Sequence, residues 1–172
     1  LNLAGVGRRF EFDLGTGGSD SEWGYGIHAG ANVNLWEGGN IGVLYNFGDG
    51  IGRYITGGLY RGAVASCSNN VNPGNAACNV DVDTLWAHGG MVRLTHNWTD
   101  NISSNVHYGF VRMEVPTGQL AKGPGGASGV VNGLNSSVDY LSGNIMWSPV
   151  SRVNIGLEVM HGWRDSFQVN ST

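Results

Sequence analysis

The feature that most constrains this chain is an unbroken alternation of apolar and small polar residues from Trp23 to Leu35. Trp, Tyr, Ile, Ala, Val and Leu occupy every second position, and Gly, His and Asn occupy the positions between them. A period of two is typical of a β-strand with two different faces. The run exceeds the usual ~5–6 residues of a globular strand and matches the ~9–11 residues of a tilted membrane-spanning strand plus flanks.

The same alternation recurs along most of the chain. Residues 41–47 and 86–98 follow it, with aromatic and aliphatic side chains on one face. The first segment is less regular, because Phe10 and Phe12 alternate with charged residues and Arg8 breaks the pattern. The pattern predicts an all-β chain of about seven antiparallel strands. We place them at residues 1–13, 22–36, 40–48, 84–98, 101–115, 137–148 and 152–164.

The connections between these strands alternate in length. Short turns are predicted at residues 37–40, 99–101 and 148–151, and long segments rich in Gly, Ser and Asn occupy residues 49–83 and 116–136. Outer-membrane β-barrels alternate tight periplasmic turns with longer outer loops in this way. We therefore expect the two long segments to be outer loops of a single barrel domain that covers residues 1–172.

The tryptophans gather at the ends of the predicted strands. A strand of about eleven residues tilted by ~40° rises roughly 27 Å, close to the ~25 Å apolar band between the aromatic girdles of a membrane barrel. The alternative is that these side chains fill the core of a soluble sandwich. We interpret them as girdles, with Trp36, Trp98 and Trp147 beside the short turns and Trp23, Trp86 and Trp163 at the opposite strand ends.

The composition of the chain excludes several classes of protein. The formal net charge is −4 at pH 7, whereas nucleic-acid-binding domains have a basic surface. Hydrophobic residues make up 41% of the chain, too many for a disordered protein, and no apolar run is long enough for a membrane-spanning helix. A transmembrane β-barrel in contact with bacterial outer-membrane lipid is therefore the membrane protein that fits. An odd strand count with two open edges predicts a portion of a larger barrel, or a count that is off by one.

The cysteines are few and close together. Cys67 and Cys78 lie in the polar segment 49–83, with no other Cys or His at ligand spacing. We predict a disulfide that clips a surface loop in an oxidising compartment, the alternative being two unpaired thiols.

Several charged side chains project to the polar face by the same alternation, or lie in the long segment 49–83 that could fold inward. We hypothesise that four arginines form a basic ladder for anionic solutes, because the guanidinium fork suits carboxylates. The alternative is that these arginines pair with nearby acids and hold the wall rigid. The ladder comprises Arg9, Arg53, Arg93 and Arg164, and the other candidate pore-lining residues are Glu11, Asp49, His107 and Glu158.

We expect no enzyme activity, no cofactor and no metal. The chain has no Gly-x-Ser-x-Gly elbow and no converging set of three or four metal ligands. The glycines of residues 48–52 are not followed by the helix that a phosphate-binding loop requires.

Several stretches resemble the DcaP-like outer-membrane porins. Residues 48–55 are similar to that family's Gly-Glu-Gly-Ile-Gly-Arg-Tyr segment, and residues 96–101 are similar to its Trp-Thr-Asp-Asn turn. Residues 144–158 resemble its Trp-Ser-Pro-Val turn and the Gly-x-Glu strand that follows. Residues 163–165, Trp-Arg-Asp, fall where the family has an Arg-Glu or Arg-Lys pair.

The resemblance implies a C-terminal-half portion of a barrel of about 16 strands. It also implies a homotrimeric diffusion channel with an N-terminal coiled-coil extension and a preference for small anionic solutes such as dicarboxylates. This sequence departs from the family in having no heptad segment and no closing strand with a terminal aromatic residue. Two other functions stay open at this stage. One is a small closed outer-membrane barrel with an adhesin or structural role, and the other is a secreted, soluble β-sandwich that binds a ligand.

Overall fold

The computed structural model describes residues 1–13, 18–55, 61–68, 77–115 and 133–167. Within these ranges the chain forms nine strands and one short 3₁₀ helix. The strands are β1 (Asn2–Asp13), β2 (Ser19–Trp36), β3 (Gly39–Asp49), β4 (Ala63–Cys67), β5 (Val80–Thr84), β6 (Trp86–Thr99), β7 (Ile102–Glu114), β8 (Asn135–Val150) and β9 (Val153–Ser166), and the helix is η1 (Gly52–Tyr54).

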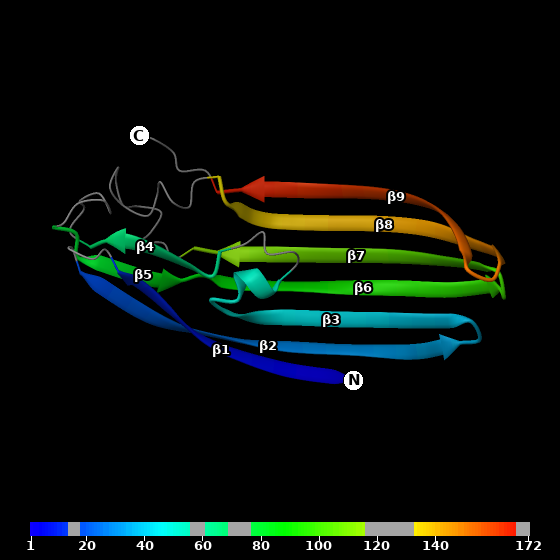
Figure 1. The fold of residues 1–172 in the computed structure, drawn as a ribbon, viewed down its shortest axis with the longest axis horizontal. Coiled ribbons are helices and arrows are strands. Elements are labelled where there is room, and N and C mark those ends of the chain that lie inside the picture. The colour runs from blue at the N-terminus through cyan, green and yellow to red at the C-terminus, as the bar shows by residue number, and fades with distance from the viewer. Residues whose placement is uncertain (14–17, 56–60, 69–76, 116–132, 168–172) are drawn as a thin grey trace.

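Seven of the strands form one antiparallel sheet in the order β1-β2-β3-β6-β7-β8-β9 (Figure 1). The short turns between β2 and β3, β6 and β7, and β8 and β9 lie at one end of the sheet, on the right of Figure 1. The prediction of an all-β antiparallel fold is confirmed, and the sheet is not closed. In the described residues, β1 and β9 each have one edge without a partner strand.

The long segment between β3 and β6 differs from the prediction of a simple loop. It contains η1 and the two-stranded hairpin β4–β5, in which Ala63 pairs with Thr84 and Cys67 with Val80. These strands have five residues each, which is too short for an alternating pattern to stand out in sequence. The other predicted long loop, at 116–136, lies almost entirely outside the described residues.

Both η1 and the hairpin lie against one face of the sheet (Figure 1), which we name the inward face. Ile51 and Ile55 are only 3% and 2% exposed, because they pack on side chains of β6 and β7. The apolar core of the described chain therefore lies between this segment and the wall, and not on both sides of the sheet. It consists of Ile51, Ile55, Val64, Leu85, Ala87, Val111, Met113 and Val115.

The opposite face, which we name the outward face, carries the large apolar side chains of the alternating pattern. Trp23, Tyr25 and Leu157 are 64%, 60% and 69% exposed. The only other sheet in the described part of the chain is the β4–β5 hairpin, so no second sheet covers this face. Among the described residues, no helix has the length and apolar character needed to cross a membrane.

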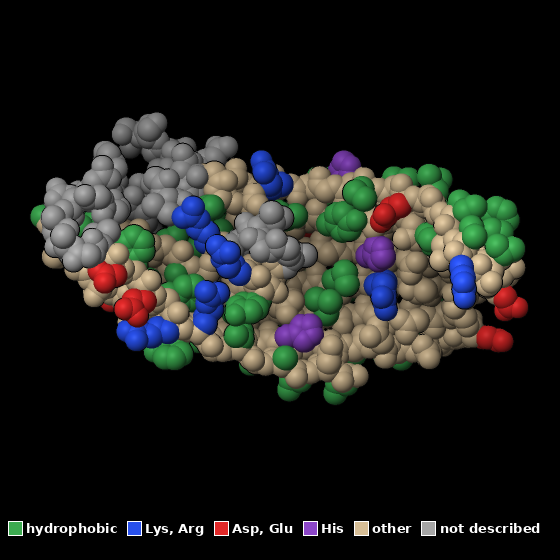
Figure 2. Space-filling model, in the orientation of Figure 1, with side chains coloured by type: hydrophobic (Ala, Val, Ile, Leu, Met, Phe, Trp, Pro, Cys, Tyr) green, Lys and Arg blue, Asp and Glu red, His purple; other side chains and the backbone are tan. Residues whose placement is uncertain are grey.

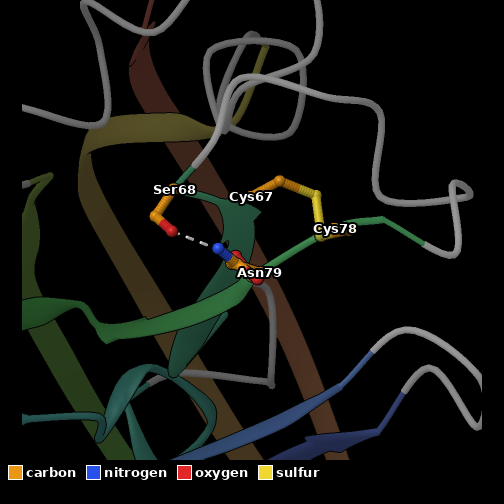
Figure 3. The surroundings of a disulfide bond; sticks show 4 residues. All are labelled: Cys67, Ser68, Cys78 and Asn79. Carbon is orange, nitrogen blue, oxygen red and sulfur yellow. Dashed lines mark hydrogen bonds between the residues drawn. A yellow bond between two sulfur atoms is a disulfide. The ribbon is translucent and has the colours of Figure 1, made fainter.

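The predicted disulfide is confirmed. Cys67 and Cys78 are bonded with their Cα atoms 5.2 Å apart, at one end of the β4–β5 hairpin (Figure 3). Beside the bond, the backbone N–H of Ser68 donates to the carbonyl oxygen of Asn79 at 2.9 Å. The hairpin also contacts the sheet, where the backbone N–H of Val82 donates to Asp20 Oδ2 at 2.8 Å.

Replacing both cysteines by serine is expected to loosen the hairpin without unfolding the sheet. Closing a loop of this length restricts the open state by about 2–3 kcal/mol, and the crosslinked residues are 11 apart. Limited proteolysis should cleave Cys67→Ser/Cys78→Ser faster between residues 67 and 78 than the wild-type protein. Equal cleavage rates would show that hairpin pairing alone holds the segment.

Candidate functional site

Side chains that are in register across the sheet form polar rows on the inward face near the short turns. One row runs through Thr95, Asn105 and Asn144 to Glu158. Thr95 Oγ1 donates to Asn105 Oδ1 at 2.7 Å, and Asn105 Nδ2 donates to Asn144 Oδ1 at 3.0 Å. The amides therefore satisfy one another along the wall and leave Glu158 as the charged member of the row.

The next row contains Arg93, with Gly42 on one side and His107 on the other. Arg93 Nη2 donates to Asn32 Oδ1 at 3.2 Å, across β3. Gly42 makes this possible, because a Cβ there would lie 2.6 Å from Asn32 Oδ1. Arg93 Nε is buried and has no hydrogen-bond partner. The guanidinium thus lies along the wall with part of its donor capacity unused.

Above these rows, η1 places Arg53 and Tyr54 over the inward face, and both side chains are exposed. The described part of the chain between β3 and β6, which we name the folded-in segment, is held at two points. The backbone N–H of Gly50 donates to Leu85 O at 3.0 Å, and Ile55 lies over Gly89, where a Cβ would come within 2.9 Å of Ile55 Cγ2. Glycine in the wall therefore lets the segment approach closely enough to narrow the space in front of the sheet.

Arg8, which sequence reasoning set aside as an irregularity, faces inward. It pairs with Gly24, and its guanidinium lies 4.2 Å from the ring centre of Phe10 and 5.8 Å from that of Tyr54. Phe10 faces inward as well, beside Gly50. The apolar alternation of β1 is inverted here because the folded-in segment, and not lipid, covers the phenylalanine.

Arg9 and Glu11 consequently lie on the outward face, which corrects the expectation that they line the inward one. Arg9 is in register with Trp23, and it bonds to Ser21 Oγ at 2.9 Å and approaches Glu11 at 3.7 Å. Asp49 also has outward parity, since it pairs with Tyr25 and Trp86. Arg9, Glu11 and Asp49 therefore do not lie on the inward face with the other expected pore-lining residues.

The remaining candidates lie on the inward face. Arg164 pairs with Val138, which in turn pairs with the core residue Val111, and His107 pairs with Arg93. Inward acidic side chains of the described sheet are Glu158 and, at the long-loop end, Asp20 and Glu22. Figure 2 shows Arg side chains, in blue, spread across this face. The inward cations of the sheet and η1 are Arg8, Arg53, Arg93 and Arg164.

A hollow of about 630 Å³ lies between η1 and the row of Arg93. Its floor includes Gly89 and Gly109, and its sides include Leu44, Tyr54 and Tyr140. An apolar hollow with aromatic edges in an otherwise polar wall can hold the carbon skeleton of a small solute.

The expected girdle residues lie where the pattern placed them along the strands. At the short-turn end, Trp36 Nε1 donates to His96 Nδ1 at 3.0 Å, and Trp98 Nε1 donates to Ser104 Oγ at 2.9 Å. Each indole N–H is thus satisfied while the ring stays at the surface, as at a membrane interface. The remaining girdle candidates are Trp147 at this end and Trp23, Trp86 and Trp163 toward the other end.

An outward ion pair at the long-loop end was missed in sequence. Arg112 Nη2 lies 3.0 Å from Asp139 Oδ2, and the Tyr108 hydroxyl donates to Asp139 Oδ1 at 2.5 Å. The two charged residues are 27 positions apart along the chain, so only the register of β7 and β8 brings them together. In the described ranges, no group of three or more His, Cys, Asp or Glu is placed to hold a metal ion.

Comparison with known proteins places the fold. No protein-family model matches the chain, and no curated protein matches its sequence. Among solved structures, it is similar to the outer membrane channel DcaP of Acinetobacter baumannii, with a TM-score of 0.64 and 18% sequence identity. The match covers 86% of this chain and 37% of that channel. The sheet therefore has the fold of part of a porin-type barrel.

Adding one methyl group at Gly89 is expected to loosen the folded-in segment. In Gly89→Ala the new Cβ would lie 2.8 Å from Phe110 O and 2.9 Å from Ile55 Cγ2, so the segment must shift. Amide hydrogen exchange at Gly50 and Tyr54 should become faster. Gly109→Ala is the matched control, because its Cβ meets nothing closer than 3.6 Å and exchange should stay unchanged. Wild-type exchange rates in Gly89→Ala would mean that this contact does not hold the segment.

Proposed function

We propose that this chain forms part of the wall of a passive outer-membrane diffusion channel that favours small anionic solutes such as dicarboxylates. The observation that carries the proposal is the charge of the inward face. Among the described residues, the wall and η1 carry four inward arginines, Arg8, Arg53, Arg93 and Arg164, and one inward acid near the short turns, Glu158. The other acids of this face lie at the long-loop end, Asp20 and Glu22 on β2 and Asp81 and Asp83 on β5. Rings of cationic side chains favour anions in a pore.

The outward face supports a membrane environment. A soluble sandwich would bury Ile27, Val43 and Val92 under a second sheet, whereas they are 44%, 43% and 44% exposed in the described structure. A continuous band of such side chains between aromatic ends matches the lipid-facing surface of a barrel. Outer-membrane lipid is therefore the proposed neighbour of this face.

The two open edges support a larger barrel. Backbone N–H and C=O groups that face hydrocarbon must be paired, so strands β1 and β9 require partner strands before the sheet can span a membrane. A barrel of about 16 strands would enclose a water-filled pore. Since this chain spans 37% of the length of the similar channel, the activity of a whole channel is part of the proposal. The proposal includes a homotrimer, which rests on the sequence resemblance alone.

Neighbouring arginines on opposite faces provide a test of the charge argument. Arg8→Gln is expected to lower the anion-to-cation permeability ratio about sevenfold, since a unit charge ~7 Å from a permeating ion stabilises an anion and destabilises a cation by about 0.6 kcal/mol each in water. Arg9→Gln removes the same charge one residue away on the outward face and should leave the ratio nearly unchanged. The measurement is the reversal potential of the intact protein in a planar bilayer under a salt gradient.

Three results would count against parts of the proposal. A cation-biased reversal potential of the wild type would remove the anion preference and keep the channel. Equal effects of the two arginine substitutions would contradict the assignment of faces. Inserted protein that carries no current would support a closed, non-conducting barrel instead.

A further inference from the structure

We propose that a small hollow in the inward wall is a proton-sensitive binding subsite for one oxoanion group, and this inference rests on the proposed channel function. The hollow has a volume of about 150 Å³ and lies between β1, β2, β3 and β6. Its polar lining consists of Asn2, His28, Asn32 and Arg93, and its lining in the described residues contains no carboxylate.

Two glycines leave the room for these side chains. A Cβ at Gly30 would collide with Asn2 Oδ1, and a Cβ at Gly42 would lie 3.5 Å from Arg93 Nη2 and 2.6 Å from Asn32 Oδ1. The polar side chains therefore lie directly over the backbone of these glycines and line the same hollow. Such a space is large enough for a carboxylate, sulfate or phosphate group.

Arg93 supplies the permanent charge. One of its donors is used by Asn32, while Nε is buried and without a partner. Because Nε is buried, the donors that an anion in the hollow can reach are the remaining Nη hydrogens of Arg93. An oxoanion is the ligand that best satisfies the free donors of a guanidinium, since the hydrogen bonds between them are charge-assisted.

His28 adds dependence on protons. Its Nδ1 lies 2.7 Å from Asn46 Oδ1, an acceptor, so Nδ1 carries the hydrogen in the neutral ring. The other ring nitrogen, Nε2, is then an acceptor in the neutral ring and repels an oxoanion. Protonation converts Nε2 into a donor and adds a positive charge, so the same ring then attracts the anion.

Among the described residues that line the hollows at His28, no carboxylate competes with an anion for the protonated ring. On η1, Tyr54 lines the neighbouring hollow together with His28, and on β6 the nearest charge is Arg93. On β1, Arg8 lies 5.8 Å from the Tyr54 ring centre, and on β3 the partner is the neutral Asn46. Anion binding should therefore become stronger as the pH falls through the range in which histidine side chains titrate.

The test is block of chloride current by sulfate, whose charge is the same at both pH values, through the intact protein in a planar bilayer. At about pH 5.5 the wild type should be blocked at a sulfate concentration about tenfold lower than at about pH 8, the effect of one added charge-assisted hydrogen bond. Formate in place of sulfate separates recognition of a carboxylate from recognition of a tetrahedral anion.

Variants assign the effect to the hollow. His28→Gln should abolish the pH dependence and keep the weak block seen at the higher pH. Arg93→Gln should weaken sulfate block at least tenfold at both pH values. Arg93→Lys keeps the charge but loses the fork of the guanidinium, so its block should be weaker than in the wild type and stronger than in Arg93→Gln. His161→Gln is the matched histidine control, because His161 makes an edge-to-face contact with Trp163 on the outward face, and it should behave as the wild type.

Each outcome separates the subsite from the channel. No current from inserted wild-type protein would overturn the proposed function and the subsite with it. Anion-selective current without sulfate or formate block at either pH would overturn the subsite alone. Retained pH dependence in His28→Gln would do the same, because the proton would then bind elsewhere.

Discussion

The packing of Ile51 and Ile55 against the wall is the contact on which the rest of the structure depends. These side chains are almost fully buried in a sheet whose opposite face is open, so they decide which face becomes the interior. Burial of two isoleucines and their neighbours stabilises the fold by roughly 1.5–3 kcal/mol per side chain. Everything placed inward, from the arginine-bearing η1 to the polar rows below it, takes its position from this contact.

Glycine in the wall makes that contact possible. At Gly26 a Cβ would collide with Ile51 Cγ2, and at Gly89 it would press on Ile55. The high glycine content of the chain, 30 of 172 residues, therefore has a local meaning on the inward face. It allows a folded-in segment and the Arg93 side chain to lie directly on backbone, where larger residues would hold them away.

The same wall combines three kinds of surface in a short distance. The asparagine row is satisfied internally, the hollow with Tyr54 and Tyr140 is apolar, and the arginines lie on both sides of it. In the proposed channel, a solute that passes along this wall would meet charge, then hydrocarbon, then charge. Residues that are distant in sequence, such as Arg93 and Arg164, share this face because the antiparallel register of β6 to β9 gives them the same parity.

The strands, the short turns and the disulfide could be predicted from sequence, because alternation, turn chemistry and isolated cysteines are local signals. The side of the sheet on which Arg8 lies could not be predicted from sequence. The alternation around Arg8 looks irregular in sequence, because Phe10 faces inward and contacts the folded-in segment, and no local pattern indicates that contact. The β4–β5 hairpin, the Arg112–Asp139 pair and the hollow at Arg93 were missed for the same reason.

The sequence by itself therefore determined a sheet of long two-faced strands with one face suited to lipid, because backbone geometry converts a period of two into two faces. Only the tertiary structure decided which face the segment between β3 and β6 covers, and thereby which charges look inward. That choice depends on contacts between residues far apart in the chain, such as Ile55 with Gly89 and Phe10 with Gly50. Local periodicity contains no information about such pairs.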